Sequence, residues 1–463
     1  MNSTVSFTSL CRKAAALSGL LLLPSAASAS GFYILEQSST LLGNAFAGAA
    51  ASAEDASTNF YNPAGLVYLD GPQIQTGLSY ITIEAEWNDR GTYNSISGQP
   101  VQGGSNVDGG TSAPVPTLYY AQPINDRLAF GFGLNAPFGL VTEYEDGWVG
   151  RYTALKSDLM TLNFNPNVAY RITDKLSVAA GIMVQYCDAE LSNAIDFSTV
   201  VVGSVANGAI PATALPDGYL AYSMASLGST AQDGKAVVSG DSVDFGFNLG
   251  IMYEFDPTLR LGLNFRSKVK HNLKGDADFT LPNDAVISAL FGGRFYDQSI
   301  NADLTTPEVL SLSLYKSYRQ WEFLADISWT NWSRFEDLYI DFEDAATPDT
   351  DIEERWTDVI RASLGFNYSL SDKLKLRAGI AYDEAPSQED NYRSPRIPDE
   401  DRFWISTGLT YNINEKLHLS AAYTYIFVDD PYVNNDTHTA GNVLIGEYDA
   451  SVSILSLGIS YNF

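Results

Sequence analysis

Apolar and polar residues alternate with a period of two through most of the chain after Gln73. From Val243 to Phe255 every odd-numbered residue is apolar or aromatic, whereas Asp244, Asn248 and Glu254 occupy even positions. The same alternation returns at 374–383 and 455–463. A period of two is that of a β-strand with one apolar face, and it differs from the 3.6-residue period of a helix. The chain is therefore predicted to be an all-β protein.

Such strands occur in soluble sandwiches and in transmembrane barrels, and three features favour the barrel. The apolar stretches approach the roughly 9–11 residues that a tilted strand needs to cross a bilayer. Their opposite face is rich in Gly, Ser and Asn, as in a lumen, and the last strand ends in Tyr461 and Phe463, as an aromatic girdle does. Closure also pairs every backbone N–H and C=O within lipid. No apolar run of about 18 residues is present, which excludes a helical membrane bundle.

The connections between the apolar stretches can be counted. Six are short and seven are long and polar or glycine-rich, and 6 + 7 = 13 connections join 14 strands. Short turns on the periplasmic side and long outer loops are the arrangement of outer-membrane barrels. The expected long loops lie roughly at 88–114, 137–157, 192–241, 274–302, 333–355, 384–399 and 429–449.

The first seventy residues do not follow the strand pattern. Residues 1–29 read as a cleaved signal peptide, with a basic start at Arg12 and Lys13, an apolar core and the small residues Ala27-Ser28-Ala29. Residues 30–70, small and polar, are predicted to form a hatch, or plug, inside a barrel of residues 71–463. A flexible leader is the alternative for 30–70.

The formal net charge of the whole chain, -28, argues against a nucleic-acid partner, because nucleic-acid binding needs a basic surface.

Short motifs are spread along the mature chain: Gly31-Phe32, Gly43 to Gly48, Asn62-Pro63-Ala64, Pro123 to Asp126, Tyr253 to Asp256, Phe265-Arg266-Ser267, Trp329 to Ser333, Ile397 to Trp404 and Tyr461-Asn462-Phe463. Together they resemble the long-chain fatty-acid transporter (FadL-type) family of outer-membrane channels. The resemblance covers essentially the whole mature chain and weakens only in the long loops. It implies a fourteen-stranded barrel with an N-terminal hatch in the outer membrane of a Gram-negative bacterium.

The resemblance also implies passive uptake of hydrophobic molecules, most directly long-chain fatty acids. Outer loops capture the ligand, an internal pocket binds it, and a hatch movement releases it sideways through a kinked third strand. The matching gate segment here contains Gly131, Gly133, Asn135, Pro137 and Gly139. Proline removes a ladder donor and glycine weakens packing, so a gap there is physically reasonable. Alternatively, Pro137 only begins the next loop.

Strand parity adds a prediction about the hatch. The apolar residues of 374–383 and 402–411 define the outer face, so Asp383 and Arg402 point into the lumen. Both occupy positions that face the hatch in the family. They are therefore predicted to hold Asn62, Pro63 and Ala64 through polar contacts, and solvated lumen charges are the alternative.

The ligand-capturing surface is predicted from apolar residues in the outer loops. An exposed apolar patch in these loops is suited to capture of a hydrophobic ligand. The alternative is that the apolar residues of a long loop pack against one another. The residues that align with the basic pocket positions of the family are Asn193 and Ile352, so Arg355 is the nearest candidate partner for a carboxylate. This departure leaves room for neutral or aromatic hydrocarbons as ligands. The capture residues are Phe138, Trp148, Leu215, Tyr219, Leu220, Tyr222, Met224 and Leu227.

Other classes of function fit the sequence less well. No nucleophile motif, zinc-protease motif or phosphate loop is present, so an enzyme is not expected, and neither a cofactor nor a metal is predicted. A general porin would not need a forty-residue plug, and an adhesin or phage receptor is compatible with the same barrel. The acidic run 336–358 is expected to be a solvated surface, with divalent-cation contacts to lipopolysaccharide as the alternative. The expected partners are a hydrophobic small molecule (a fatty acid or a hydrocarbon), outer-membrane lipid and lipopolysaccharide, and the chain is expected to be a monomer.

Overall fold

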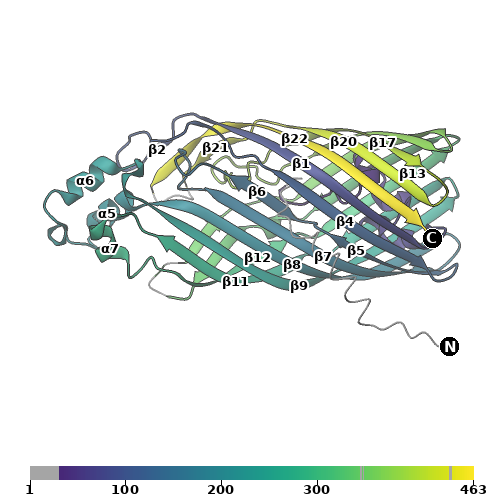
Figure 1. The fold of residues 1–463 in the computed structure, drawn as a ribbon, viewed down its shortest axis with the longest axis horizontal. Helices are drawn as coiled ribbons and strands as arrows, with labels where there is room; N and C mark the ends of the chain where they lie inside the picture. The colour runs from purple at the N-terminus through teal and green to yellow at the C-terminus, as the bar shows by residue number, and fades with distance from the viewer. Residues whose placement is uncertain (1–30, 345–346, 348, 437–440) are drawn as a thin grey trace, which may run out of the picture.

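The computed structural model describes residues 31–344, 347, 349–436 and 441–463, and the predicted signal peptide lies outside them. The described chain forms a closed antiparallel barrel of 14 strands, which confirms the number predicted from the connections. Short turns lie at the end with the C-terminus, and long segments project from the other end (Figure 1). We call these the turn end and the loop end. Within the described residues, no helix is long and apolar enough to span a membrane.

The barrel strands follow one another around the wall in chain order. The first strand, β1 (Gln73–Asp89), pairs along its whole length with the last, β22 (Asn442–Asn462), and this pairing closes the cylinder. The third wall position is shared by two short strands, β5 (Leu128–Asn135) and β6 (Gly139–Glu143). The others are β4 (Ser112–Pro123), β7 (Lys156–Arg171), β8 (Leu176–Asp196), β9 (Asp233–Asp256), β10 (Leu259–Arg266), β13 (Val309–Tyr318), β14 (Trp321–Thr330), β17 (Val359–Ser371), β18 (Leu374–Asp383), β19 (Arg402–Asn412) and β20 (Leu417–Val428).

Several segments predicted as loops are regular structure instead. β9 is long enough to pair with β10 near the turn end and with β11 (Val269–Thr280) near the loop end. Turn residues in the sequence do not mark such extensions, because the hydrogen-bond ladder between two strands can continue beyond the membrane. The additional strands are β2 (Tyr93–Asn94), β3 (Asn106–Asp108), β12 (Gln298–Thr306), β15 (Asp337–Phe342), β16 (Thr350–Glu353) and β21 (Tyr432–Asn435).

Three helices cap the loop end of the barrel (Figure 1). They are α5 (Phe197–Ala206), α6 (Tyr219–Ser226) and α7 (Ala285–Phe291). Phe197 and Val201 of α5 pack with Leu215, Ile287 and Phe291 in a small core of their own. Single 3-10 turns are η3 (Ala212–Ala214), η4 (Thr230–Gln232) and η5 (Trp332–Arg334).

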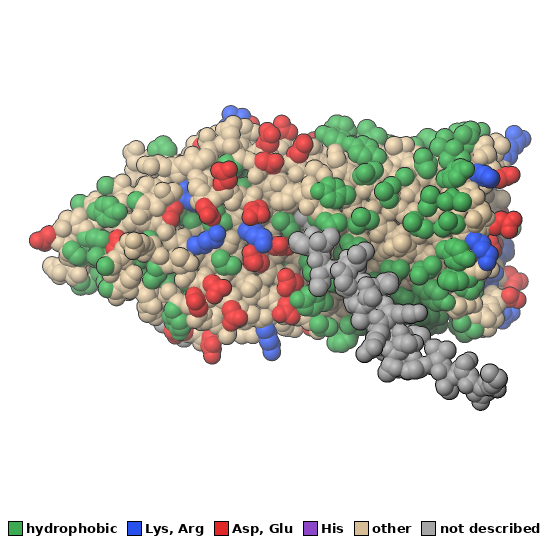
Figure 2. Space-filling model, in the orientation of Figure 1, with side chains coloured by type: hydrophobic (Ala, Val, Ile, Leu, Met, Phe, Trp, Pro, Cys, Tyr) green, Lys and Arg blue, Asp and Glu red, His purple; other side chains and the backbone are tan. Residues whose placement is uncertain are grey.

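The alternation of side chains sorts them between lipid and lumen as predicted. Phe245 and Phe247 are 69% and 49% exposed on the outer face of β9, whereas Asn248 beside them is buried. Asp383 and Arg402 are buried on the inner face, so their predicted orientation is confirmed. On the face shown in Figure 2, hydrophobic side chains gather over the half that carries the C-terminus, and charged side chains lie beyond them at both ends. This belt is the surface expected of a membrane barrel.

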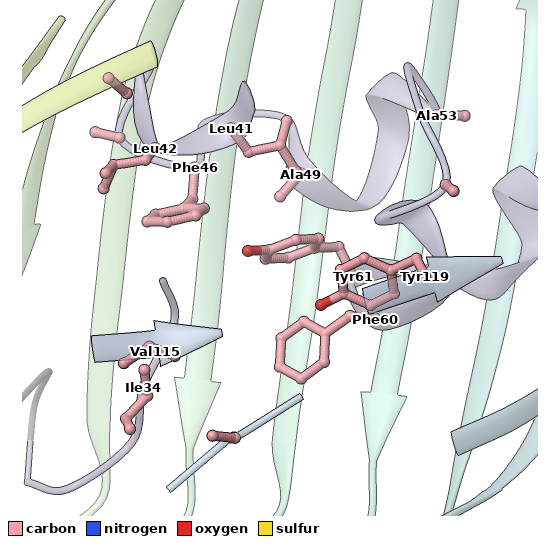
Figure 3. Close-up of a cluster of buried hydrophobic side chains, with 14 of the residues drawn as sticks. Ile34, Leu41, Leu42, Phe46, Ala49, Ala53, Phe60, Tyr61, Val115 and Tyr119 are labelled. Carbon is pink, nitrogen blue, oxygen red and sulfur yellow. The ribbon is translucent and has the colours of Figure 1, made fainter. Parts of the chain in front are cut away.

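The N-terminal residues fold inside the barrel as a compact hatch. It consists of α2 (Ser39–Leu42), α3 (Ala49–Ser52), α4 (Thr58–Tyr61) and the 3-10 helix η2 (Pro63–Tyr68). Phe46, Phe60 and Tyr61 of the hatch converge with Val115 and Tyr119 of β4 (Figure 3). Two wall glycines allow the hatch to approach the backbone closely. A Cβ on Gly379 would lie 2.2 Å from the Asn44 backbone, and one on Gly250 would lie 2.2 Å from the Asn62 side chain.

Candidate ligand cavity and wall gap

An apolar cavity of about 80 Å³ lies between the hatch and the wall, toward the loop end. Phe32, at the start of the hatch, lines the cavity and packs its ring 4.7 Å from Trp332 and 5.5 Å from Phe335. Wall strands and the additional strands β11, β12 and β15 contribute aliphatic side chains to the lining, among them Leu140, Leu159, Val238, Leu273, Ile300 and Ile340.

One buried base and one buried acid interrupt this apolar lining. Arg396 belongs to the loop between β18 and β19, and its Nη1 donates to the backbone oxygen of Lys156 and to Ser157 Oγ, both at 3.2 Å. Burial lowers the pKa of Arg396 to about 10, so it remains charged at neutral pH. Glu354 lines the same cavity, and burial raises its pKa to about 7, opposed by the charge of Arg396. The cavity therefore presents a fixed positive group beside an acid that titrates near neutrality.

Arg355, the base predicted from the sequence, does not line this cavity. Its side chain is 48% exposed, forms an ion pair with Glu353 at 3.0 Å and lies over the ring of Tyr392 at 4.1 Å. Arg355 follows the end of β16 and has a positive φ of 50°, and the neighbouring Glu354 takes the inward position. Asn193 and Ile352 are not among the lining residues either. Sequence reasoning missed Arg396, although it directly precedes the recognised Ile397-Pro398 motif.

The Asn62-Pro63-Ala64 segment of the hatch is bound by residues of β8, β9 and the hatch itself. Asn62 Nδ2 donates to the carbonyl oxygens of Ala50 and Ile251, at 2.7 and 3.0 Å, and Ser177 Oγ donates to Ala64 O at 3.1 Å. These bonds attach the segment to β8 and β9, and the role predicted for Asp383 and Arg402 in holding Asn62, Pro63 and Ala64 stays a prediction.

The charges of β18 and β19 contact other parts of the hatch. Arg402 pairs with Asp399, and Asp399 in turn accepts from the backbone N–H of Gly31 at 2.7 Å. Glu54 of the hatch forms ion pairs with Lys375 at 3.1 Å and with Arg377. Alternation already placed Lys375 and Arg377 on the inner face, so this contact carried a sequence signal.

The predicted gate segment coincides with a gap in the hydrogen-bond ladder of the wall. Gly131, Gly133 and Asn135 lie in β5, Pro137 lies in the interruption, and Gly139 begins β6. β5 pairs with β4 from Leu118 to Pro123, whereas β6 pairs with β7. Across the described part of the wall, residues 112–117 of β4 therefore pair with β1 alone. We call this interruption the wall gap.

Hatch residues take the place of the missing strand at the wall gap. The N–H of Ile34 donates to Pro137 O at 2.8 Å, and the N–H of Gly139 donates to Phe32 O at 3.0 Å. The Gln37 side-chain amide donates to Ala136 O at 2.8 Å and accepts from the Ala136 N–H at 3.2 Å. Cavity, hatch and wall gap are thus linked through residues 32–37.

The predicted capture residues divide into buried and exposed sets. Trp148 is fully buried between Trp87 and Tyr144, and Phe138 is buried beside Phe32, so neither is a surface residue. Leu215 and Leu227 are also buried, and Tyr219 and Leu220 pack against the cap core. Much of the loop therefore packs on itself, and the prediction of an exposed patch is wrong for these residues. Tyr222 and Met224 remain 47% and 55% exposed.

A closed barrel with an outer apolar belt, an internal hatch and an apolar cavity defines an outer-membrane channel for hydrophobic compounds. The chain belongs to the family of outer membrane transport proteins described as OMPP1/FadL/TodX, whose model matches residues 20–463. The predicted family is therefore confirmed, and its members are transport channels rather than enzymes.

Individual relatives cover nearly the whole chain. It is 34% identical over 422 residues to outer membrane protein P1 of Haemophilus influenzae, with 88% of each chain covered. It is 32% identical to the long-chain fatty acid transport protein of Escherichia coli K12, covering 92% of this chain and 94% of the relative.

Solved structures share the fold. A FadL homologue of Pseudomonas aeruginosa superposes with a TM-score of 0.84 at 25% identity, covering 94% of this chain and all of that one. The toluene transporter TodX of Pseudomonas putida superposes with a TM-score of 0.68 at 20% identity, with 94% and 100% covered.

Proposed function

We propose that this channel takes up long-chain fatty acids and holds their carboxylate beside Arg396 in the apolar cavity. The observation that carries the proposal is a buried arginine in a lining that consists mainly of aliphatic and aromatic side chains, with Asp158 and Glu354 as its acids. An alkyl chain gains roughly 0.8 kcal/mol per buried CH₂, which accounts for binding of the chain but not for a fixed cation. A guanidinium in an apolar site suits a carboxylate, because charged hydrogen bonds are strong there.

Release from such a cavity requires that its lining change, because a pocket that binds tightly also releases slowly. Phe32 lines the cavity and hydrogen-bonds to Gly139 at the wall gap. A hatch movement that withdraws residues 32–37 would open the cavity and free the edge of β6 together. The ligand would then leave sideways into lipid.

Glu354 supports a second candidate, a neutral or aromatic hydrocarbon as ligand. When ionised, this carboxylate repels a fatty-acid carboxylate and offsets the charge of Arg396, which leaves a site better suited to a neutral molecule. The toluene transporter TodX of Pseudomonas putida shares the fold at 20% identity.

Binding of two ligands of equal chain length separates the candidates. The purified channel in lipid nanodiscs would be titrated with oleate and with oleyl alcohol. We expect oleate to bind roughly tenfold or more tightly, since a hydrogen bond to a charged group is worth about 1.5–3 kcal/mol. Arg396→Gln should remove that difference, and Arg355→Gln should keep it. Equal binding of both ligands by the wild type would contradict the fatty-acid proposal, and loss in Arg355→Gln alone would restore the assignment made from the sequence.

A further inference from the structure

Two prolines lie in the stretch of β4 that borders the wall gap. Pro114 and Pro116 fall within residues 112–117, which pair with Tyr80 and Leu78 of β1 on one side. On the other side β5 is paired only from Leu118 onward. Both prolines are half-buried on the outer face that Leu118 and Tyr120 share.

The backbone groups of these prolines are directed to the gap. On β4, the N–H of Ile124 donates to Leu128 O at 2.8 Å, so even-numbered residues face the side of β5. Thr111 O accepts from the N–H of Ile83 at 2.9 Å, so odd-numbered residues face β1. Backbone groups alternate in this way along an antiparallel strand. Proline has no N–H, so the edge of β4 lacks a donor at two successive gap-facing positions.

The donors on the opposite edge of the gap are already bound by other partners. The N–H of Ala136 donates to Gln37 Oε1 at 3.2 Å and that of Gly139 to Phe32 O at 3.0 Å. The N–H of Phe138 is turned away from the gap to β7, where it donates to Thr161 Oγ1 at 2.9 Å. An unpaired N–H is costly in lipid, where water cannot replace the missing partner. The edge of β4 therefore avoids an unpaired N–H because its prolines have none, and the opposite edge avoids it because its N–H groups bind other partners.

We propose that Pro114 and Pro116 are positioning residues that keep the wall gap from pairing shut. An ordinary residue at either position would present an N–H to the acceptors opposite, Ala136 O and Pro137 O. Those acceptors now bind Gln37 Nε2 and Ile34 N–H of the hatch. A new donor on β4 would compete with the hatch for them and draw the β5–β6 segment back to the wall. The inference rests on the proposed lateral exit of the ligand.

The test supplies the missing donors with Pro114→Val/Pro116→Val. Valine keeps an apolar outer face and favours a strand. We expect oleate uptake by cells to fall roughly five-fold or more while the oleate Kd of the purified channel stays within about two-fold of wild type. The new amides at 114 and 116 should be protected from hydrogen exchange, a readout that a merely structural role would not move. Pro123→Val, at the turn end of the same strand, is the matched control and should behave as wild type.

The outcomes separate this inference from the proposed function. Wild-type uptake with freely exchanging amides at 114 and 116 would overturn the role of the prolines. An absence of oleate binding and uptake in the wild-type channel would instead overturn the proposed function. If the double variant does not assemble, the single Pro116→Val variant is measured in the same assays, with the same results expected and excluded.

Discussion

Two parts of the barrel wall use their backbone groups in opposite ways. β8 and β9 pair without interruption from Leu176↔Tyr253 to Asp196↔Asp233. β4 loses its second neighbour at residues 112–117, where prolines remove donors and the hatch binds the facing segment. The comparison teaches that a membrane wall can be interrupted only where other groups replace the ladder, because lipid offers no partner.

The largest effect is expected from a proline placed in the continuous region. Ala180 of β8 pairs with Val168 and Leu249, so Ala180→Pro must remove a ladder hydrogen bond on one side. The loss, ~3 kcal/mol or more, is increased in lipid by the unpaired acceptor. We expect no folded barrel, as measured by heat-dependent migration on gels. Ser112→Pro, at the gap edge, is the matched control and should assemble; equal failure of both variants would remove the distinction between the two regions.

A smaller effect is expected when the hatch releases the wall gap. Gln37→Leu leaves the N–H and C=O of Ala136 without the side-chain amide that now pairs them. Each buried group left unpaired costs about 1–3 kcal/mol. Hydrogen exchange at Ala136 to Gly139 should therefore accelerate, while exchange along β8 and β9 stays unchanged.

The control for this variant is Gln73→Leu, which breaks a hydrogen bond to Asn462 at the turn end. It should leave exchange at the gap unaltered. Uniform acceleration over the whole barrel in Gln37→Leu would show that the hatch stabilises the wall globally rather than at the gap.

The cavity lies between the two regions, with Leu140 of β6 on one side and Val238 of β9 on the other, and its acid gives a pH test. The pKa of Glu354 is raised to about 7, so this group is neutral below that pH and negative above it. The other charges in the cavity lining are those of Arg396 and of Asp158, which lies 3.4 Å from Lys156. Affinity for oleate should fall as pH rises through 7, by roughly five-fold, on the order of 1 kcal/mol.

Glu354→Gln is the control for that pH dependence. Titration of oleate itself is common to both proteins, so the difference between them isolates the side chain. The variant should bind oleate more tightly than wild type at pH 8 and equally at pH 6. Parallel pH profiles for the two proteins would exclude Glu354 from the binding site.

The smallest effect is expected in the cap above the continuous region. Tyr222 and Met224 are exposed, so Tyr222→Ala/Met224→Ala should change the unfolding free energy by about 0.5 kcal/mol or less. Loss of an exposed apolar surface should slow oleate uptake at low ligand concentration and leave the Kd of the cavity unchanged. Leu215→Ala, which alters the buried cap core, should instead lower stability. Uptake at the wild-type rate in the double variant would remove the cap from ligand capture.

The sequence by itself determined the all-β class, the 14 strands and the face of each side chain, because these follow from a local period of two and from turn chemistry. It also located the interruption at Pro137, since proline acts on its own backbone. The partners were decided only by the tertiary structure. Arg396 rather than Arg355 lines the cavity, and Glu54 of the hatch forms ion pairs with Lys375 and Arg377 of β18. No local pattern predicts these partners, because the contacts join segments hundreds of residues apart. The curvature of the closed wall and the path of the hatch inside it set which inward side chains meet, and neither is encoded in any local pattern.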